Sequence, residues 1–426
     1  MLAAGPYPSR DDIERGYVQL LDLFGVDISS FERRRYVNLS QEPNKAANLN
    51  SYIRLIGENF KEVVDGDTRH LVGCDKASGT LTVPTAEYVV NVDADSILLP
   101  EYVSTLIRFM EEPGNERVAV VQTPYSAVPG ARTLLERLGG ATTDIQYIIH
   151  QGFTRYGATF WVGANALIRR AALDDIAYVE CERGFEVVTY IKDRTVIEDT
   201  ESTIDLVTRG WQLHNYPDRL SYSATPPDFG ALLIQRRRWA NGGLLILPQL
   251  LSYLSGGSFT VRKVAEGLVR FHYLTSIAGV NAGLLLLLTI PLEDNSAAFW
   301  LALASLPYYY IYARDLKVNG YRWSDVFRVY ALNLMLLPVN LGGVLKSLKQ
   351  AWTGRKIPFG RTPKTNGRTS APPGYLLAEY GLLTYCALAF CVDIVAGRYR
   401  PCPLQLGERT LLRLRSGEPH RLEREH

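Results

Sequence analysis

The sequence lacks the residue patterns that mark several common classes of protein. It has only five cysteines, and they form no Cys-x-x-Cys pair. An odd number of isolated cysteines indicates neither a zinc site nor a disulfide framework, so we expect free thiols facing a reducing compartment. The amino-terminal segment has no basic region followed by an apolar core and does not resemble a signal peptide. The net charge of +2 is too small to indicate a partner of either sign, and no nucleic acid is expected.

Apolar residues are present in ordinary amount but are unevenly distributed. Hydrophobic residues make up 47% of the chain and charged residues 21%, which is typical of a folded protein. The region from Gly267 to Gly397, however, carries long apolar runs that a soluble domain does not need. Four segments are candidates for membrane helices: 268–291, 297–313, 326–345 and 376–396. The sequence therefore predicts an integral membrane protein with several spans in a lipid bilayer.

The distribution of charge predicts how these segments are oriented. The loop after the first span contains Glu293 and Asp294 but no Lys or Arg, which places it outside. The preceding domain and the basic segment 346–375 are then cytoplasmic, at a plasma or inner membrane. This arrangement requires segment 326–345, which polar residues and a proline interrupt, to lie in the interface or to re-enter. The number of spans, three or four, and the side of the Arg-rich tail 397–426 stay open.

An apolar, β-branched run from Tyr88 ends abruptly at Asp93 and Asp95. Buried parallel strands deliver such groups to the carboxyl edge of an α/β sheet, where ligands usually bind. A helix over 99–112 and a strand over 117–122 follow, which predicts a βαβ unit and a parallel sheet. The two carboxylates suit Mg²⁺ or Mn²⁺ with positions left for a diphosphate. A solvated turn after a strand is the alternative.

Two further segments combine small or polar residues with the start of a helix. Residues 44–50, NKAANLN, place Lys45 in the first turn of a helix, where free backbone N–H groups favour a phosphate. A capped surface helix explains the same residues. Residues 160–173, FWVGANALIRRAAL, either form a wall around an acceptor or simply pack against the sheet.

Acidic residues also occur where another helix is expected to begin. Residues 195–211 predict a strand, then Glu198 and Asp199, then a helix closed by Gly210. The acids either complement the helix dipole and cap free N–H groups, or one of them is a general base at the edge of the same sheet. The sequence leaves both interpretations open.

Residues 229–248 place three arginines and a tryptophan on a helix next to the membrane segments. A basic amphipathic helix with Trp commonly lies in the lipid interface. Gln235 and Arg238, three residues apart on one face, also suit a diphosphate, and Trp239 offers a flat surface to a sugar ring. Residues 357–364, IPFGRTPK, are either a basic linker attracted to anionic lipid or a mobile lid over a charged substrate.

Taken together and in this order, these motifs resemble those of the processive family 2 glycosyltransferases. Cellulose synthase and related bacterial β-glucan synthases are the closest likeness, with chitin and hyaluronan synthases further off. The family pattern reads KAGNLN, DxD, TED, QxxRW and FxVTxK, and this chain reads KAANLN, DAD, IED, QRRRW and FGRTPK. The resemblance extends from about residue 30 to residue 396.

The resemblance implies a role for each matched position. It implies nucleotide-sugar contacts at Lys45, Asp93, Asp95, Gln235 and Arg238, a metal at Asp93 and Asp95, a base at Asp199, an acceptor platform at Trp239 and a gate at Phe359, Thr362 and Lys364. The implied fold class is α/β, with a GT-A-like (Rossmann-like) domain followed by transmembrane helices. We assign residues 1–228 to that cytoplasmic domain, 229–266 to interface helices, 267–396 to membrane helices with a gating-type loop over 346–375, and 397–426 to a polar tail.

The implied activity is inverting transfer of a sugar from a UDP-sugar, foremost UDP-glucose, to a growing β-linked polysaccharide, with Mg²⁺ or Mn²⁺ as cofactor. Family members also carry a PxYNE-like strand and an Asp-Asp-Gly segment that hold the nucleobase, and neither precedes Lys45. We therefore expect a domain incomplete at its amino terminus, with an exposed sheet edge. The alternative is a non-catalytic or truncated membrane subunit that needs a complete partner. Other synthase or export subunits are further candidate partners.

Overall fold

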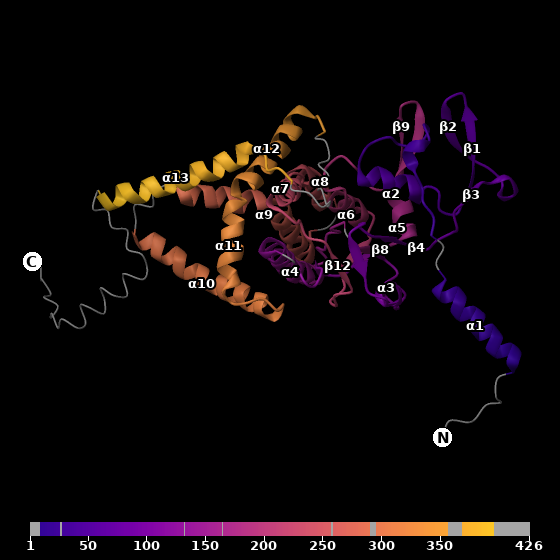
Figure 1. Cartoon of the computed structure of the whole chain (residues 1–426), viewed down its shortest axis with the longest axis horizontal. Helices are drawn as coiled ribbons and strands as arrows, with labels where there is room; N and C mark the ends of the chain where they lie inside the picture. Colours follow the sequence, from indigo (N-terminus) through magenta and orange to yellow (C-terminus); the bar gives the residue numbers. More distant parts are fainter. Residues whose placement is uncertain are drawn as a thin grey trace, which may run out of the picture.

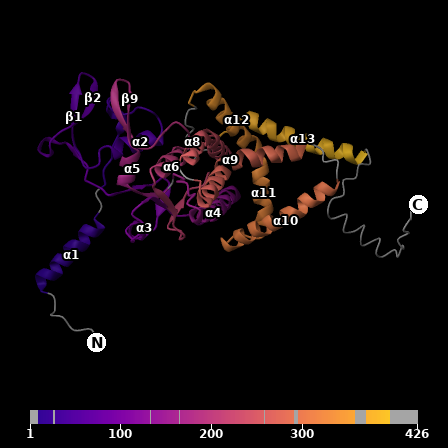
Figure 2. The same cartoon turned by 180° about the vertical axis from the view of Figure 1, so that it is seen from behind.

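The computed structural model describes residues 9–25, 28–131, 133–163, 165–256, 259–289, 295–356 and 369–395. Figure 1 shows an α/β region at one end of the molecule and long helices at the other. The amino-terminal helix α1 (Arg10–Phe24) projects away from the α/β region in both Figure 1 and the opposite view in Figure 2. Its apolar side chains Ile13, Tyr17 and Val18 are exposed.

The α/β region is built on a four-stranded sheet with the strand order β11-β6-β8-β4. The strands are β4 (Tyr88–Asn91), β6 (Val118–Gln122), β8 (Ala166–Arg169) and β11 (Gln212–Asn215). β4 and β6 are each antiparallel to β8, whereas β6 is parallel to β11. β4 and β6 thus run in the same direction, as the βαβ pattern predicts, but β8 lies between them. The expectation of a purely parallel sheet is wrong, and the sheet is mixed, with β4 at one edge.

Helices cover both faces of this sheet, because the strands are apolar on both sides. They include α3 (Tyr102–Met110), α5 (Arg170–Ile176) and α6 (Glu198–Thr208). Tyr102 and Leu106 of α3 pack with Val121 of β6 in one buried cluster. Leu206 of α6 packs with Val120 in another, on the opposite side of the strand. All five residues of β6 are buried, so this strand is the centre of the fold.

Helix α6 ends at a glycine, as predicted, whereas the strand expected before the helix is absent. The helix begins at Glu198 and is followed by Gly210, whose φ of 81° is in the left-handed region that glycine tolerates. The chain over 195–197 is irregular instead of extended in a strand.

Smaller sheets surround the main one. β5 (Ser96–Leu98), β12 (Ser221–Ser223) and β7 (Tyr125–Ala127) form one, and β2 (Thr68–Gly73), β1 (Asn59–Asp65) and β3 (Leu81–Thr82) form another. The hairpin of β9 (Tyr178–Glu182) and β10 (Phe185–Thr189) lies beside β1 and β2 at the far end of the α/β region (Figure 1). At its tip, Arg183 donates hydrogen bonds to the carbonyl oxygens of Val37 and Leu39, which holds the chain that leads into α2 (Lys45–Ile53).

The helix predicted over 229–248 is two helices, α7 (Phe229–Ala240) and α8 (Gly243–Ser255). They are separated at Gly242, whose φ is 151° and where a Cβ atom would lie 2.5 Å from Cγ1 of Ile197. Only glycine fits this close approach. α7 packs beside α4 (Leu134–Arg155), where Leu232 and Leu233 share a core with Leu138 and Ala141.

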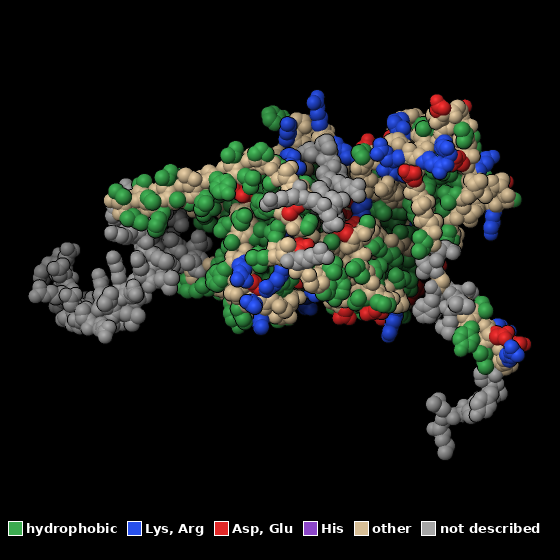
Figure 3. Space-filling model, in the orientation of Figure 1, with side chains coloured by type: hydrophobic (Ala, Val, Ile, Leu, Met, Phe, Trp, Pro, Cys, Tyr) green, Lys and Arg blue, Asp and Glu red, His purple; other side chains and the backbone are tan. Residues whose placement is uncertain are grey.

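Long helices make up the rest of the described chain. They are α9 (Val261–Thr289), α10 (Asn295–Val318), α11 (Asp325–Met335), α12 (Leu337–Thr353) and α13 (Pro373–Val395). Among the described residues, α9 and residues 373–392 of α13 are long and apolar enough to cross a membrane. α11 and α12, bent by 45° at their junction, would together make a third span. Figure 3 shows hydrophobic side chains along α13, which is what a lipid-facing helix requires.

The predicted interruption of segment 326–345 corresponds to this bend between α11 and α12. Residues 297–313 are helical within α10. α10 is not among the described helices that are long and apolar enough to cross a membrane, so a membrane span over 297–313 stays a prediction. The gating-type segment 357–368 and the tail from residue 396 lie outside the described residues.

Candidate active site

Lys45, Asp93 and Gly163 meet where the first turn of α2 faces the end of β4. Nζ of Lys45 forms an ion pair with Asp93 and donates a hydrogen bond of 2.7 Å to the carbonyl oxygen of Gly163. Asn91, the last residue of β4, donates to the same carbonyl at 3.1 Å. Lys45 and Asp93 are partly exposed, so a ligand can reach both. The structure thus brings together two residues that the motifs place in one site.

Asp93 and Asp95 lie in the turn between β4 and β5. The backbone N–H of Ser96 donates to the carbonyl of Asp93 at 2.9 Å, as the turn interpretation requires. A turn alone, however, does not explain an ion pair between Asp93 and a lysine 48 positions earlier in the sequence. Asp95 is half-buried two residues further along the same turn.

The start of α2 is capped from within the protein. The Asn44 side chain accepts a hydrogen bond of 2.8 Å from the N–H of Ala47 and donates one of 2.9 Å to Asp193. Asp193 also accepts a hydrogen bond from Lys356, the last described residue before segment 357–368. The capped-helix interpretation of this segment is therefore satisfied at Asn44, while Lys45 points to Asp93 and Gly163.

Gly163 lies directly against Asp199. Its φ is 80°, and a Cβ atom at this position would lie 2.9 Å from Cγ of Asp199 and closer still to Oδ2. The segment that contains Gly163 is fixed by Gln122 of β6, which accepts a hydrogen bond from the N–H of Val162 and donates one to the carbonyl of Phe160. Residues 160–163 are therefore fixed beside Asp199. Phe160 and Trp161 are buried in the core, as the packing alternative requires, and a wall around an acceptor stays a prediction.

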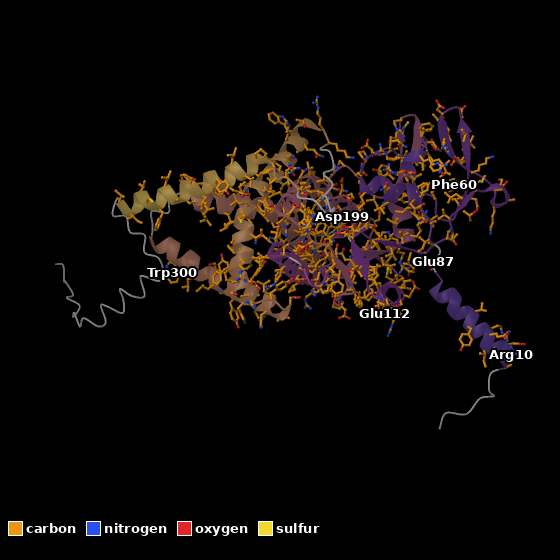
Figure 4. All side chains as sticks on the ribbon, in the orientation of Figure 1. Arg10, Phe60, Glu87, Glu112, Asp199 and Trp300 are labelled. Carbon is orange, nitrogen blue, oxygen red and sulfur yellow. The ribbon has the colours of Figure 1, made fainter. Side chains whose placement is uncertain are left out.

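Asp199 is in the first turn of α6, near the centre of the molecule, between the α/β region and the long helices (Figure 4). Burial raises the pKa of Asp199, and a hydrogen bond from the N–H of Thr200 and the charges of Lys45 and Arg238 act against this rise. Burial and the charge of Asp199 raise the pKa of Glu198. Two adjacent carboxyl groups with raised pKa values next to two cations are typical of a catalytic site.

α7 brings Gln235, Arg238 and Trp239 to the same region. Asp228, the residue before the helix, caps it by accepting a hydrogen bond of 2.8 Å from the N–H of Ala231. Arg238 is close enough to act on the pKa of Asp199, while Gln235 is half-buried one turn earlier. The guanidinium carbon of Arg236 lies 4.6 Å from the centre of the Trp239 ring. A sugar would therefore have to stack on the other face of Trp239.

Several side chains that shape the site have no motif in the sequence. Gly163 is recognisable only from its contact with Asp199, and Arg236 only from its burial, which lowers its pKa to about 10. An aromatic cluster also lies nearby and links β7, α4 and α9: Tyr125, Tyr147, His150, Phe153, Phe160 and Tyr273. The only sequence signals for Arg236 and Gly163 were the run of three arginines and the Gly-Ala-Asn turn, respectively. Phe359, Thr362 and Lys364 lie outside the described residues.

The donor set for a metal ion is small. Among the described residues there is no group of three or more His, Cys, Asp or Glu side chains placed to hold an ion. Asp93 and Asp95 supply carboxylate oxygens on one turn, and Mg²⁺ commonly binds through one or two carboxylates together with substrate phosphates and water. The residues present therefore fit a divalent ion that arrives with a diphosphate.

Comparison with known proteins gives one family match. A family model described as glycosyl transferase family group 2 matches residues 88–312, just over half of the chain. The match begins at the first residue of β4 and ends within α10. It includes Asp93, Asp199 and the α7 motif, whereas Lys45 lies before it.

Curated relatives are similar over parts of the chain. An N-acetylglucosaminyltransferase of Rhizobium leguminosarum bv. viciae is 26% identical over 331 residues, which cover 71% of this chain and 70% of that protein. A UDP-forming cellulose synthase catalytic subunit of Komagataeibacter sucrofermentans is 26% identical, over 65% of this chain and 36% of that protein. Glucomannan 4-beta-mannosyltransferase 2 of Arabidopsis thaliana is 28% identical, over 38% of this chain and 28% of that protein. The chain spans only about a third of the length of the last two relatives.

Among solved structures, the mannosyltransferase PcManGT from Pyrobaculum calidifontis, in complex with GDP-Man and Mn²⁺, aligns with a TM-score of 0.36 and 15% identity. The alignment covers 81% of this chain and 76% of that one.

Proposed function

The chain belongs to the glycosyl transferase family group 2 and is a glycosyltransferase, and we propose that it transfers a sugar from a nucleoside diphosphate donor to a growing polysaccharide. The resemblance to the processive, cellulose synthase-like members of this family, predicted from the motifs, is confirmed by these matches. The mixed sheet with helices on both faces agrees with a GT-A-like fold.

One arrangement supports the proposal most directly: a half-buried carboxylate, Asp199, with Lys45 and Arg238 close enough to act on its pKa. The carboxylate and the cations come from three different helices, α6, α2 and α7, so their proximity does not follow from local sequence. Gly163 leaves room for nothing larger than hydrogen on that side of Asp199. Such a cluster has the two parts that sugar transfer from a diphosphate needs, a base and a positively charged diphosphate site.

The roles follow from the charges. Asp199 takes the proton from an acceptor hydroxyl as that oxygen attacks the anomeric carbon, and the bond to the donor diphosphate breaks on the opposite face of the sugar. Arg238 and Lys45 stabilise the negative charge that develops on the leaving diphosphate, so no general acid is required. Displacement of this kind inverts the anomeric carbon and gives a β-linkage from an α-linked donor. Burial raises the pKa of Asp199 and so makes the carboxylate a stronger base.

A divalent ion is part of the proposal. Asp93 and Asp95 would hold Mg²⁺ or Mn²⁺, which when bound supplies further positive charge to the diphosphate. Because Asp93 also pairs with Lys45, the lysine and the ion would share the task of neutralising the phosphates. Removal of the ion with EDTA should abolish transfer, and addition of Mn²⁺ or Mg²⁺ should restore it.

We propose UDP-glucose as the donor, with a β-linked glucan as the product. The named relatives support a hexose or N-acetylhexosamine donor, and the cellulose synthase subunit is described as UDP-forming. We place the enzyme in a membrane through α9 and α13, with the α/β region on the cytoplasmic side, because the loop after α9 is acidic and contains no basic residue.

The test is incorporation of labelled sugar into polymer by membranes that carry the full chain. UDP-glucose, UDP-N-acetylglucosamine and GDP-mannose are supplied separately, and the product is digested with linkage-specific hydrolases. Membranes from cells with an empty vector are the control. Polymer from UDP-glucose that a β-glucanase degrades is the expected result. Absence of incorporation from all three donors, together with no Mn²⁺-dependent binding of UDP, would instead favour the non-catalytic subunit.

A further inference from the structure

A charged side chain on the candidate membrane helix α9 is completely buried against the α/β region. Arg270 is 0% exposed and forms an ion pair of 2.7 Å with Glu266, one turn earlier. Its other nitrogens donate to the backbone carbonyls of Gly157 at 2.7 Å and Thr159 at 3.2 Å. A buried guanidinium is retained only where its donors are satisfied, so the geometry of this contact is well defined.

Tyr273 lies three residues further along α9 and therefore on the same face. Its ring is stacked on Phe160, with centroids 4.5 Å apart and an interplanar angle of 20°. The guanidinium carbon of Arg270 lies 5.0 Å from the centre of the same Phe160 ring. Phe160 is thus held by both residues of α9, and α9 holds the chain from Gly157 to Phe160 through two carbonyls and one ring.

This contact extends to both sides of the proposed base. On one side, Phe160 begins the fixed segment that ends at Gly163, the residue against which Asp199 lies. On the other side, Tyr273 packs against the cluster that contains Ile204 of α6, and its hydroxyl is close enough to Thr200 and Asp199 to interact electrostatically with both. The N–H of Thr200 in turn donates to Oδ1 of Asp199 at 2.7 Å. Helix α9 therefore contacts the two segments that fix the carboxylate of Asp199.

We propose that Arg270 and Tyr273 are positioning residues through which the membrane helix α9 fixes Asp199 relative to Gly163. The inference rests on the proposed role of Asp199 as the base. Neither residue is assigned to contact the donor or the acceptor, so both act through Phe160 and Thr200. The site would then be correctly arranged only when α9 is packed in its native position, which couples sugar transfer to the membrane-embedded part of the chain.

The primary test is Tyr273→Phe, which removes one hydroxyl and keeps the ring stacked on Phe160. The matched control is Tyr385→Phe, because the hydroxyl of Tyr385 also donates to α9, at the carbonyl of Thr289, but far along the helix from Asp199. We expect Tyr273→Phe to lower kcat by about tenfold to a hundredfold, as displacement of a reacting group does. The KM for the donor should stay within twofold of wild type, since the diphosphate contacts are not touched.

Hydrogen exchange of the full-length protein in detergent gives a second readout that does not need activity. Tyr273→Phe should accelerate exchange in peptides that contain residues 160–163 and 198–203, whereas Tyr385→Phe should leave these peptides unchanged. Arg270→Lys keeps the charge but loses the paired donors to Gly157 and Thr159, and it should accelerate exchange over 157–163. Unchanged exchange in both variants would overturn the inference, whether or not any transfer is measured.

The two measurements separate the inference from the proposed function. If wild-type membranes incorporate sugar and Tyr273→Phe has wild-type kcat, the positioning role is wrong while the transferase stands. If exchange responds as expected but neither wild type nor variant transfers sugar, the contact is real and the proposed reaction is wrong, which removes the role assigned to it.

Discussion

Gly163 lies so close to Asp199 that a methyl group at position 163 would collide with the carboxylate. The carbonyl of the same glycine accepts hydrogen bonds from Lys45 and Asn91, so one residue contacts the proposed base with its Cα and the proposed diphosphate contact with its oxygen. The proposed base and the proposed diphosphate contact therefore both lie against the same residue.

We predict that Gly163→Ala abolishes most of the activity. The added methyl group displaces the carboxylate of Asp199, and a displacement of about 1 Å costs on the order of a hundredfold in rate. Gly157→Ala is the matched control, because Gly157 has a similar φ of 67° but nothing within 4 Å of its Cβ position. Both variants carry the same backbone strain, of about 1 kcal/mol. Equal loss of kcat in the two variants would mean that strain, and not the contact with Asp199, explains the effect.

Lys45→Met should raise the KM for the donor and lower kcat/KM by about a hundredfold, since it removes one cation from the diphosphate site and leaves Asp93 without its ion-pair partner. Lys192→Met is the control: Lys192 forms an ion pair of 2.8 Å with Asp205 at comparable exposure, away from the site. Donor binding is measured by titration with UDP in the presence of Mn²⁺. Indistinguishable UDP affinity in wild type and Lys45→Met would exclude Lys45 from the diphosphate site.

The sequence was informative where structure is local. The sequence predicted the helices that begin near residues 45, 102 and 198, because a helix depends on residues within a few turns of one another. The insertion of β8 between β4 and β6 was not predictable, since strand pairing joins segments far apart in the chain. The break after Ala240 was missed because it depends on the approach of Ile197 to Gly242, which is also a tertiary contact.

The candidate site likewise contains residues that the sequence predicted and residues that it did not. The motifs named Lys45, Asp93 and Asp199, and the structure brings them together. No motif singled out Gly163 or Arg236. Which of the three consecutive arginines of α7 packs on Trp239 depends on the orientation of the helix against α4, where Arg236 also bonds Thr142. That orientation is set by tertiary packing and not by the run of arginines itself.

His150 gives the protein a pH-dependent stability. Burial lowers its pKa to about 4, from an ordinary value of 6.5, and its Nδ1 has no partner among the described residues. As the pH falls, His150 therefore becomes protonated near pH 6.5 in the unfolded chain but only near pH 4 in the folded chain. Stability contributed by neutral His150 is complete above pH 6.5 and is lost as the pH falls toward 4, by up to about 3 kcal/mol.

We therefore predict that the melting temperature of the purified protein falls from pH 7 to pH 5 less steeply in His150→Phe than in wild type. Phe is apolar, cannot be protonated, and can stack on Phe153 and contact Tyr273 edge-to-face as the imidazole does. His70→Phe, in strand β2, is the control and should keep the wild-type slope. Parallel pH profiles for His150→Phe and wild type would show that His150 does not carry this dependence.

The most direct test of the central claim, that Asp199 is the base of a sugar transfer, compares Asp199→Asn with Asp205→Asn. Both carboxylates lie on α6, but Asp205 pairs with Lys192 and Gln249 away from Lys45 and Arg238. Initial rates of polymer formation are measured in membranes at matched protein levels, together with UDP affinity. We predict that Asp199→Asn lowers kcat by about 10²- to 10⁴-fold with unchanged UDP affinity, while Asp205→Asn stays close to wild type. Undiminished transfer by Asp199→Asn would contradict the account.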